Sequence, residues 1–294
     1  MAHILKNKNL EIHVDDPMDN YGFSRFDWTG KISKVSFQNI EFAGIERTDI
    51  LNEFQYGQGF YNEFGIDGAL DYQEVQKGEW FHKIGIGLLK KDDDSYNFHK
   101  KYDIRPAKFE VQSDGNDMII NCRSEESNGY AYNLTKRIEL NDEGFTIKYT
   151  LRNHGIKDII LDEYNHNFMA IGKDLIGSNY ILRFPFELKQ NAFNEAVNLE
   201  GKVEVTDREF RFNGTPNDQF FYANISGGKS VNASWELINT ERNVGIRETG
   251  SFNTNKINLW GWKHVISPEL FFKIDLKPGE TAEWSRIYDI FRIK

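Results

Sequence analysis

The chain has 294 residues, a formal net charge of −9 at pH 7, an isoelectric point near 5.4 and a single cysteine. The acidic balance argues against nucleic acid and anionic membrane surfaces as partners, because both attract basic protein surfaces. One cysteine excludes an intramolecular disulfide and a thiolate metal cluster. Aromatic residues make up 14% of the chain, which favours strands, whose half-buried surfaces suit such side chains.

The first predicted elements are two strands, over residues 31–37 and 40–42, which form a hairpin around Gln38-Asn39. A longer irregular stretch, residues 52–78, follows and is rich in glycine, tyrosine, phenylalanine and acidic residues. Connections of this length are often functional or lid-like, so we expect this one to border a site.

The middle of the chain predicts two more hairpins. Residues 108–111 and 118–122 flank the turn Asp114-Gly115-Asn116, and residues 130–140 and 145–151 flank a turn over residues 141–144. In the last of these strands apolar and polar residues alternate, which is typical of a strand with one buried and one solvated face. Cys122 ends an apolar run, where we expect a buried side chain rather than a nucleophile.

The last predicted strands cover residues 271–276 and 284–291, joined by the turn Lys277-Pro278-Gly279-Glu280. Helical periodicity is weak throughout, and strands about 8–12 residues apart predict an all-β antiparallel sandwich or barrel. No linker-like stretch divides the chain, so we expect one domain over residues 1–294. The sequence lacks the apolar segment of a signal peptide and a membrane-spanning run, so we expect a cytoplasmic protein.

Phosphate-loop, zinc-protease and serine-hydrolase motifs are absent from the sequence. Its strongest polar cluster is Asp162-Glu163-Tyr164-Asn165-His166-Asn167-Phe168. On a strand, Tyr164, His166 and Phe168 share one face, whereas Asn165 and Asn167 share the other. A histidine between aromatic residues suits a general acid at neutral pH, and a structural histidine fits the same pattern.

Two further features suit carbohydrate chemistry. In the segment Ser267-Pro268-Glu269-Leu270-Phe271-Phe272, Pro268 marks a strand start and Glu269 stands at the strand mouth, as a catalytic base or as a rim charge. The indole rings of Trp28, Trp260 and Trp262 either stack on sugar rings or pack in the core.

Five stretches together resemble the aldose 1-epimerase (galactose mutarotase-like) superfamily, in the order in which that family has them. They are residues 25–32 with the hairpin that follows, residues 62–66, residues 78–87, Tyr164-Asn165-His166-Asn167-Phe168, and Pro268-Glu269 with Leu276-Lys277-Pro278-Gly279-Glu280. The resemblance implies the galactose mutarotase-like fold, a large antiparallel β-supersandwich with a sugar cleft on one sheet face. It also implies interconversion of the α and β anomers of an aldose, with no cofactor and no metal.

The resemblance further implies roles for single residues. His166 matches the histidine that acts as general acid toward the ring oxygen, and Glu269 matches the general base on the C1 hydroxyl. The family's second histidine precedes a glycine, whereas this sequence reads His82-Lys83-Ile84-Gly85, so His82 or Lys83 is the candidate there. The predicted substrate-binding residues are Arg25, His82, Lys83, Tyr164, Asp218, Trp260 and Trp262.

Other functions remain open on the sequence. A hexose-6-phosphate mutarotase would need phosphate contacts, for which Arg25, Lys83 and Arg247 are candidates. A non-catalytic carbohydrate-binding protein would use the same cleft, and the missing His-Gly signature favours it. An oligosaccharide hydrolase would need a second acid near Glu269, and its candidates are Asp162, Glu163 and Asp218. The expected ligand is a monosaccharide or a sugar phosphate, and the expected state is a monomer or a homodimer.

Overall fold

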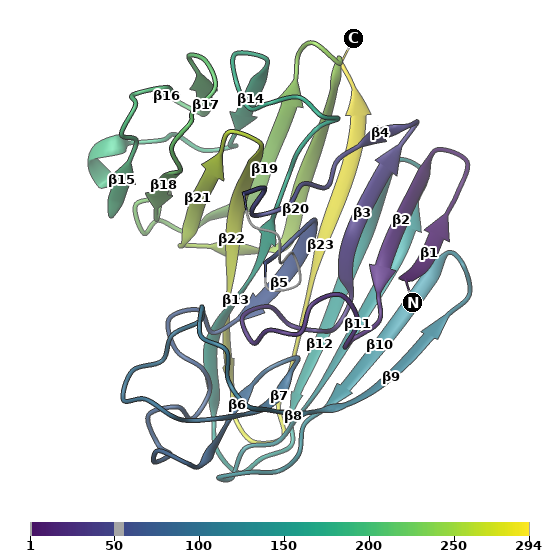
Figure 1. Cartoon of the computed structure of the whole chain (residues 1–294), viewed down its shortest axis with the longest axis vertical. Helices are drawn as coiled ribbons and strands as arrows, with labels where there is room; N and C mark the ends of the chain where they lie inside the picture. The colour runs from purple at the N-terminus through teal and green to yellow at the C-terminus, as the bar shows by residue number, and fades with distance from the viewer. Residues whose placement is uncertain (1, 50–55, 294) are drawn as a thin grey trace.

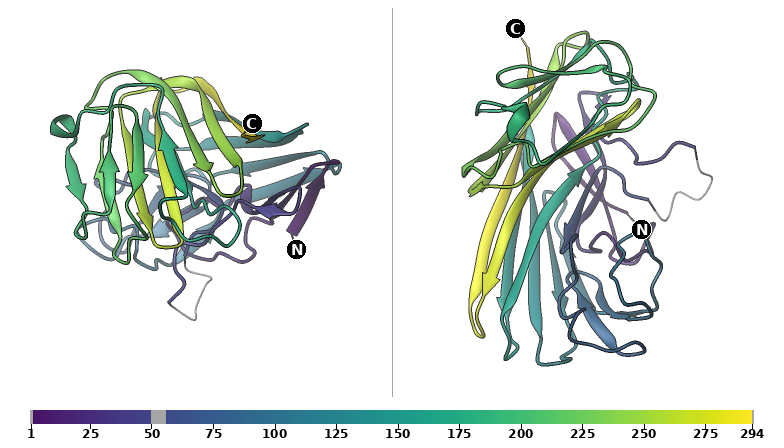
Figure 2. Two further views of the ribbon diagram at one scale, coloured as in Figure 1. Left: turned by 90° about the horizontal axis from the view of Figure 1, so that it is seen from above. Right: turned by 90° about the vertical axis from the view of Figure 1, so that its left-hand side faces the viewer.

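The computed structural model describes residues 2–49 and 56–293. Within these residues the chain forms 23 β-strands, arranged in two large antiparallel sheets and one small sheet (Figure 1). The two large sheets lie one against the other, as the side view shows (Figure 2). The predicted all-β antiparallel supersandwich is therefore confirmed.

The first sheet runs in the order β1-β2-β3-β5-β13-β22-β21-β18-β15, and β4 pairs with β3 beside it. Its strands are β1 (Ala2–Lys6), β2 (Leu10–Asp15), β3 (Lys31–Phe37), β4 (Ile40–Glu41), β5 (Phe60–Phe64), β13 (Ile159–Asn167), β15 (Glu195–Val197), β18 (Phe220–Ala223), β21 (Ile257–Trp262) and β22 (Val265–Leu276).

The second sheet runs in the order β16-β17-β14-β19-β20-β23-β12-β11-β10-β9. Its strands are β9 (Lys108–Ser113), β10 (Asp117–Arg123), β11 (Tyr132–Asn141), β12 (Gly144–Asn153), β14 (Tyr180–Arg183), β16 (Val203–Val205), β17 (Glu209–Phe212), β19 (Val231–Asn239), β20 (Val244–Thr254) and β23 (Thr281–Arg292). The small sheet consists of β6 (Trp80–Lys83), β7 (Gly87–Lys90) and β8 (Ile104–Pro106), and a 3₁₀ turn, η2 (Gln190–Ala192), precedes β15.

The main core lies between the two large sheets, where alternate side chains of both meet. Phe60 of β5 packs edge-on against Phe145 of β12 and Tyr288 of β23, with ring centroids 5.2 and 4.9 Å apart. Each fully buried ring of this kind stabilises the fold by about 1.5–3 kcal/mol relative to an exposed one. The first sheet is therefore held rigidly on the second, and its other face is free to carry a site.

A buried charged network also joins the sheets. Arg286 of β23 is fully buried and donates to Glu163 of β13 at 2.8 Å and to Glu248 of β20 at 2.7 Å. Asn167 of β13 donates to the same Glu248 at 2.8 Å. Buried ion pairs bring little net stability, but loss of one partner leaves an uncompensated charge. The network therefore fixes the side chains of β13 that point into the core.

The three predicted hairpins are confirmed: β3 pairs with β4, β9 with β10, and β11 with β12. Gln38 and Asn39 have φ values of 48° and 66°, which fits a tight turn. Cys122 is buried, as expected, and burial raises the pKa of its thiol far above the ordinary value. The last predicted strand pair differs in one respect, because β22 lies in the first sheet and β23 in the second.

Two sequence predictions need correction. Residues 52–78 are not one irregular loop, because residues 60–64 form β5, a fully buried strand inside the first sheet; residues 52–55 lie outside the described residues. Pro268 does not start a strand either, because β22 begins three residues earlier, at Val265. The lid-like role was expected from the length of the irregular stretch, and β5 divides that stretch.

The part of the chain that the structure describes contains no helix long and apolar enough to cross a membrane. Within the same residues, no group of three or more histidine, cysteine or acidic side chains is arranged to hold a metal ion.

Candidate active site

The candidate site is a row of side chains that crosses three neighbouring strands of the first sheet. The antiparallel register of β13 and β22 pairs Tyr164 with Phe271. The regular pairing ends there, and two residues further along His166 lies beside Glu269, with Nε2 and Oε1 3.2 Å apart. Glu269 in turn pairs with Asn258 of β21. All three side chains leave the sheet on the face away from the second sheet, because successive strand residues alternate between faces.

The strands β13 and β22 separate at this point of the sheet. Their regular pairing ends at Tyr164 and Phe271, before it reaches Pro268. Proline has no N–H to give to a neighbouring strand, so it is compatible with a gap in the ladder. The carbonyl of Pro268 accepts a side-chain hydrogen bond from Asn167 at 2.8 Å instead. Beside this gap His166 contacts both Ser267 and Glu269.

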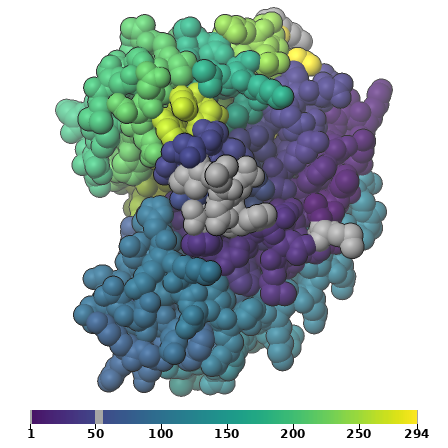
Figure 3. All heavy atoms as spheres, viewed as in Figure 1, coloured from purple at the N-terminus to yellow at the C-terminus, as the bar shows by residue number. Residues whose placement is uncertain are grey.

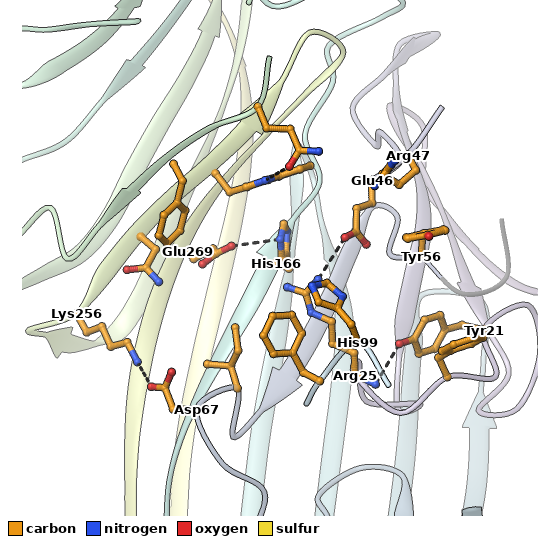
Figure 4. A pocket seen from close by; sticks show the side chains of 17 residues that line it. Tyr21, Arg25, Glu46, Arg47, Tyr56, Asp67, His99, His166, Lys256 and Glu269 are labelled. Atoms are coloured by element: carbon orange, nitrogen blue, oxygen red, sulfur yellow. Dashed lines mark hydrogen bonds and ion pairs between the residues drawn. The ribbon is translucent and has the colours of Figure 1, made fainter. Parts of the chain in front are cut away.

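A cavity of about 630 Å³ opens over this row. Its wall combines strands of the first sheet with segments from elsewhere in the chain, as the close view shows (Figure 4). In the space-filling view, the purple and blue N-terminal residues form the right and lower parts of the face and the green residues its upper left (Figure 3).

His166 and Glu269 contact each other directly at the floor of the cavity. His166 Nε2 lies 3.2 Å from Glu269 Oε1, and His166 Nδ1 lies 2.7 Å from the hydroxyl of Ser267 (Figure 4). The imidazole stacks on the ring of Phe168 at 3.9 Å and meets the indole of Trp260 edge-on at 5.5 Å. Both members of the pair are less than one-twentieth exposed, so their orientation is set by packing and hydrogen bonds.

Burial controls the protonation of the pair. It raises the pKa of Glu269 to about 8, although the positive charge of Arg25 opposes the rise. It also lowers the pKa of His166 well below its ordinary 6.5, and the charge of Arg25 acts in the same direction. At neutral pH the proton shared by the pair therefore resides on Glu269, and His166 is neutral. Glu269 then donates to Nε2, and Nδ1–H of the neutral imidazole donates to Ser267.

Arg25 forms the part of the wall beside His166. Its Nε donates to Glu63 Oε2 at 3.0 Å, one terminal nitrogen donates to Glu46 Oε1 at 3.3 Å, and the other donates to the hydroxyl of Tyr164 at 3.3 Å. The guanidinium also lies 4.7 Å from the ring centre of Phe98. Arg25 is thus a cation whose charge is already balanced by two carboxylates.

The opposite edge of the cavity carries a second ion-pair cluster. Lys256, just before β21, lies 2.7 Å from Asp67 and 3.2 Å from Asp162 (Figure 4). Its ammonium also lies 4.2 Å from the ring centre of Phe271. Asp67 belongs to the segment directly after β5, so this contact joins that segment to the strand that carries Asn258.

No protein-family model matches the sequence, and no curated protein sequence matches it significantly. Several crystal structures nevertheless superpose over essentially the whole chain. A galactose mutarotase-like protein from Lactobacillus casei ATCC 334 gives a TM-score of 0.61 at 13% identity, with 99% of this chain and 100% of that chain covered. The chain has the galactose mutarotase-like fold.

Two further structures support this assignment. A galactose mutarotase-like protein from Clostridium acetobutylicum gives a TM-score of 0.60 at 10% identity, with 99% and 95% of the two chains covered. An aldose epimerase homologue from C. elegans gives 0.56 at 11% identity, with 100% and 99% covered. At such identities the likeness establishes the fold alone, so any activity has to be argued from the site.

Four of the residues predicted for the site line the cavity. His166 and Glu269 form the central pair, and Arg25 and Trp260 lie beside it. The indole N–H of Trp260 donates to Gln219 at 3.2 Å, and both side chains line the cavity. The predicted alternation along β13 is also confirmed, because Asn165 and Asn167 point into the core network.

The other predicted substrate-binding residues do not line the cavity. Tyr164 and Lys83 lie behind its wall, where both contact Glu63, and Lys83 is only 1% exposed. His82 is fully buried between Asp71 and the carbonyl of Glu125, because successive residues of β6 point to opposite sides. His82 therefore has no path to a ligand in this cavity.

Asp218 and Trp262 also lie outside the cavity lining. The backbone N–H of Asp218 donates to Glu200 in an exposed loop, and the neighbouring Gln219 reaches the cavity instead. The indole N–H of Trp262 donates to the carbonyl of Asn217. Trp28, the third tryptophan singled out in the sequence, is buried and donates to the carbonyl of Phe23.

Several cavity residues escaped the sequence analysis. Asn258 had a usable signal, because it lies two residues before Trp260 on one strand and so shares its face. Phe221 also lies on a strand, β18, which pairs with β21. The others come from connecting segments whose side chains follow no period, and they are Tyr21, Phe23, Glu46, Arg47, Tyr56, Ile66, Asp67, Phe98, His99, Gln219 and Lys256. Residues 52–78 were expected to border a site, and three of them, Tyr56, Ile66 and Asp67, line the cavity.

Proposed function

We propose that the protein is an aldose 1-epimerase, which interconverts the α and β anomers of a free sugar. The observation that carries this proposal is the buried contact between His166 and Glu269 at the floor of the cavity. An acid and a base in contact suit two sugar oxygens that are bonded to the same carbon, C1. The fold shared with aldose epimerase homologues supports the general kind of protein.

The proposed reaction needs two proton transfers, and the sugar gains as many protons as it loses. Ring opening breaks the bond between C1 and the ring oxygen, while one proton leaves the C1 hydroxyl and another reaches the ring oxygen. The resulting aldehyde rotates about the bond between C1 and C2, and the ring recloses on the other face. Proton transfer by positioned side chains contributes typically 10²–10⁴-fold to such steps.

The pair holds one proton before and after ring opening. In its ion-paired form, His166 protonates the ring oxygen and Glu269 accepts the C1 hydroxyl proton, as the family resemblance implies. This transfer leaves neutral His166 and protonated Glu269, which is the form that burial favours. Reclosure then reverses both transfers. The neutral form catalyses the same exchange with the two roles exchanged.

The charges around the cavity favour a neutral aldose over a sugar phosphate. Arg25 is paired with Glu46 and Glu63, and Lys256 with Asp67 and Asp162. Arg47 at the rim is paired with Asp49. A phosphate at any of these cations would have to displace a carboxylate.

The other phosphate candidates give no support either. Lys83 lies behind the wall on Glu63, and Arg247 pairs with Glu236 on the second sheet. Glycoside hydrolysis is likewise unsupported, because it needs two carboxyl groups that flank one bond. Its candidates, Asp162, Glu163 and Asp218, are absent from the cavity lining, and Glu163 faces the core.

Two-dimensional exchange NMR on common aldoses at anomeric equilibrium tests the proposal directly. We expect faster α/β exchange for at least one neutral aldose, and loss of this acceleration in His166→Ala and Glu269→Gln. His154→Ala and Glu143→Gln, at exposed positions, are matched controls and should behave as wild type. Resonance broadening on binding without faster exchange, for every aldose, would instead identify a non-catalytic sugar-binding protein.

A further inference from the structure

Glu63 is a fully buried carboxylate directly behind the cavity wall. It lies on β5 opposite Tyr164 of β13, and its Oε2 accepts the Tyr164 hydroxyl at 2.6 Å and Arg25 Nε at 3.0 Å. Its Oε1 lies 3.5 Å from the ammonium of Lys83 on β6. One carboxylate therefore joins side chains from two strands of the first sheet, the small sheet and the segment before β3.

The two cations on Glu63 each hold one aromatic residue of the connection between β7 and β8. The guanidinium of Arg25 lies between Phe26 and Phe98, 4.5 and 4.7 Å from their ring centres. The ammonium of Lys83 donates to the hydroxyl of Tyr96 at 2.9 Å. We name residues 91–103 the aromatic loop; its residues Phe98 and His99 line the cavity.

The charge of Glu63 also acts on the proton-transfer pair. The groups that act on Glu269 are its partner His166, Asn258, the phenol of Tyr164, and the cations Arg25 and Lys256, with Glu63 behind Arg25. The positive charge of Arg25 lowers the pKa of Glu269, and the negative charge of Glu63 raises it. Glu63 itself faces Arg25, Lys83 and the phenols of Tyr164, Tyr96 and Tyr21, and Glu46 also acts on Arg25 and Tyr21.

We propose that Glu63 is a positioning residue of the epimerase reaction, an inference that rests on the function proposed above. It balances the charge of Arg25 beside the proton-transfer pair, and through Arg25 and Lys83 it holds the aromatic loop against the cavity. Glu63 touches no substrate in this role. It acts on the reaction through the electric field at Glu269 and through the placement of Phe98 and His99.

The two parts of this role predict different effects of substitution. Glu63→Gln removes the negative charge, so Arg25 and Lys83 act on Glu269 with less compensation and Glu269 ionises at lower pH. The pH at which activity falls on the alkaline side should drop by about one unit, and KM should rise on the order of tenfold. Glu63→Asp keeps the charge but shortens the reach, so KM should rise while the alkaline limb stays in place.

Lys83→Met should shift the alkaline limb of the pH profile in the opposite direction to Glu63→Gln. It remains a test of the proposal if the Glu63→Gln variant does not fold. It removes a buried positive charge that now balances Glu63, so the alkaline limb should move to higher pH. Tyr96→Phe removes only the hydrogen bond to Lys83 and should raise KM without a shift of the limb. The surface substitution Glu143→Gln removes one negative charge at an exposed position, so it is the control for the change in net charge alone.

The measurements are pH profiles of anomer exchange for wild type and variants, together with carbon-13 NMR titration of the Glu269 carboxyl. The inference is supported by limb shifts of opposite sign in Glu63→Gln and Lys83→Met, matched by the titrations. It is overturned if folded Glu63→Gln and Lys83→Met variants lose activity at the same alkaline pH as wild type and show the same NMR titration of the Glu269 carboxyl. An inactive wild type would refute the epimerase activity alone, because the titration still reports whether Glu63 acts on Glu269.

Discussion

Glu269→Gln should inactivate the protein and, at neutral pH, make it more stable. Burial raises the pKa of Glu269 from an ordinary 4.5 to about 8 in the folded protein. As pH rises from 4.5 to 8, the unfolded chain gains stability by releasing this proton, while the folded chain keeps it. Wild type therefore loses stability across this window. Glutamine is neutral at every pH and similar in shape, so the variant does not.

The magnitude follows from the same pKa. Each unit of pKa difference corresponds to about 1.4 kcal/mol, so the loss in wild type between pH 4.5 and 7 is on the order of 3 kcal/mol. For a chain of 294 residues this corresponds to a difference of about 5 °C in Tm. Loss of the proton-transfer group Glu269 should at the same time reduce anomer exchange by about 10²–10⁴-fold.

Thermal and urea unfolding at several pH values between 4.5 and 8 measure this effect. The quantity to compare is the change with pH of the difference between variant and wild type, because any packing defect of glutamine is constant and cancels. Glu143→Gln, at an exposed carboxyl, is the control and should show no such trend. A difference that stays constant from pH 4.5 to 8 would refute the claim that Glu269 is protonated in the folded protein.

Three other predictions follow from the site and the core. Wild-type anomer exchange should be nearly constant between pH 6.5 and 7, fall to about half near pH 8, and fall about tenfold per unit well above pH 8, because Glu269 loses its proton with a pKa of about 8. Its acid limb should lie well below pH 6.5, because the pKa of His166 is lowered. A profile that peaks near pH 5 would contradict this assignment. Trp260→Ala removes the ring beside His166, so KM should rise on the order of tenfold with a smaller change in kcat in steady-state kinetics. Arg286→Ala leaves Glu163 and Glu248 buried without their cation, which should cost about 3–5 kcal/mol and lower Tm in calorimetry; an unchanged Tm would refute the importance of that network.

Much of the fold was accessible from local sequence patterns. Alternation of apolar and polar residues in residues 145–151 and the turn residues before them define β11 and β12 without any tertiary information. The same alternation sorts Tyr164, His166 and Phe168 onto one face of β13 and Asn165 and Asn167 onto the other. Such patterns are readable because a strand with two different faces repeats every two residues.

The same patterns failed where a strand is buried on both faces. Residues 60–64 carry no alternation, since one side of β5 meets the core and the other meets the residues behind the cavity wall. A mixture of aromatic, polar and acidic residues there resembled an irregular loop. The prediction that Pro268 starts a strand was wrong for a related reason. A proline inside a strand is compatible with the local gap between β13 and β22, and this gap is a tertiary feature.

By itself the sequence determined the all-β class, the principal hairpins, and the two side chains, His166 and Glu269, that meet at the centre of the site. Only the tertiary structure decided which charged residues join them. Glu46, Asp67 and His99 reach the cavity from connections whose course is set by packing, while Lys83 and His82 are turned into the interior. The physical reason is that strand periodicity is local, whereas the pairing of strands and the course of connections depend on contacts between residues far apart in the chain.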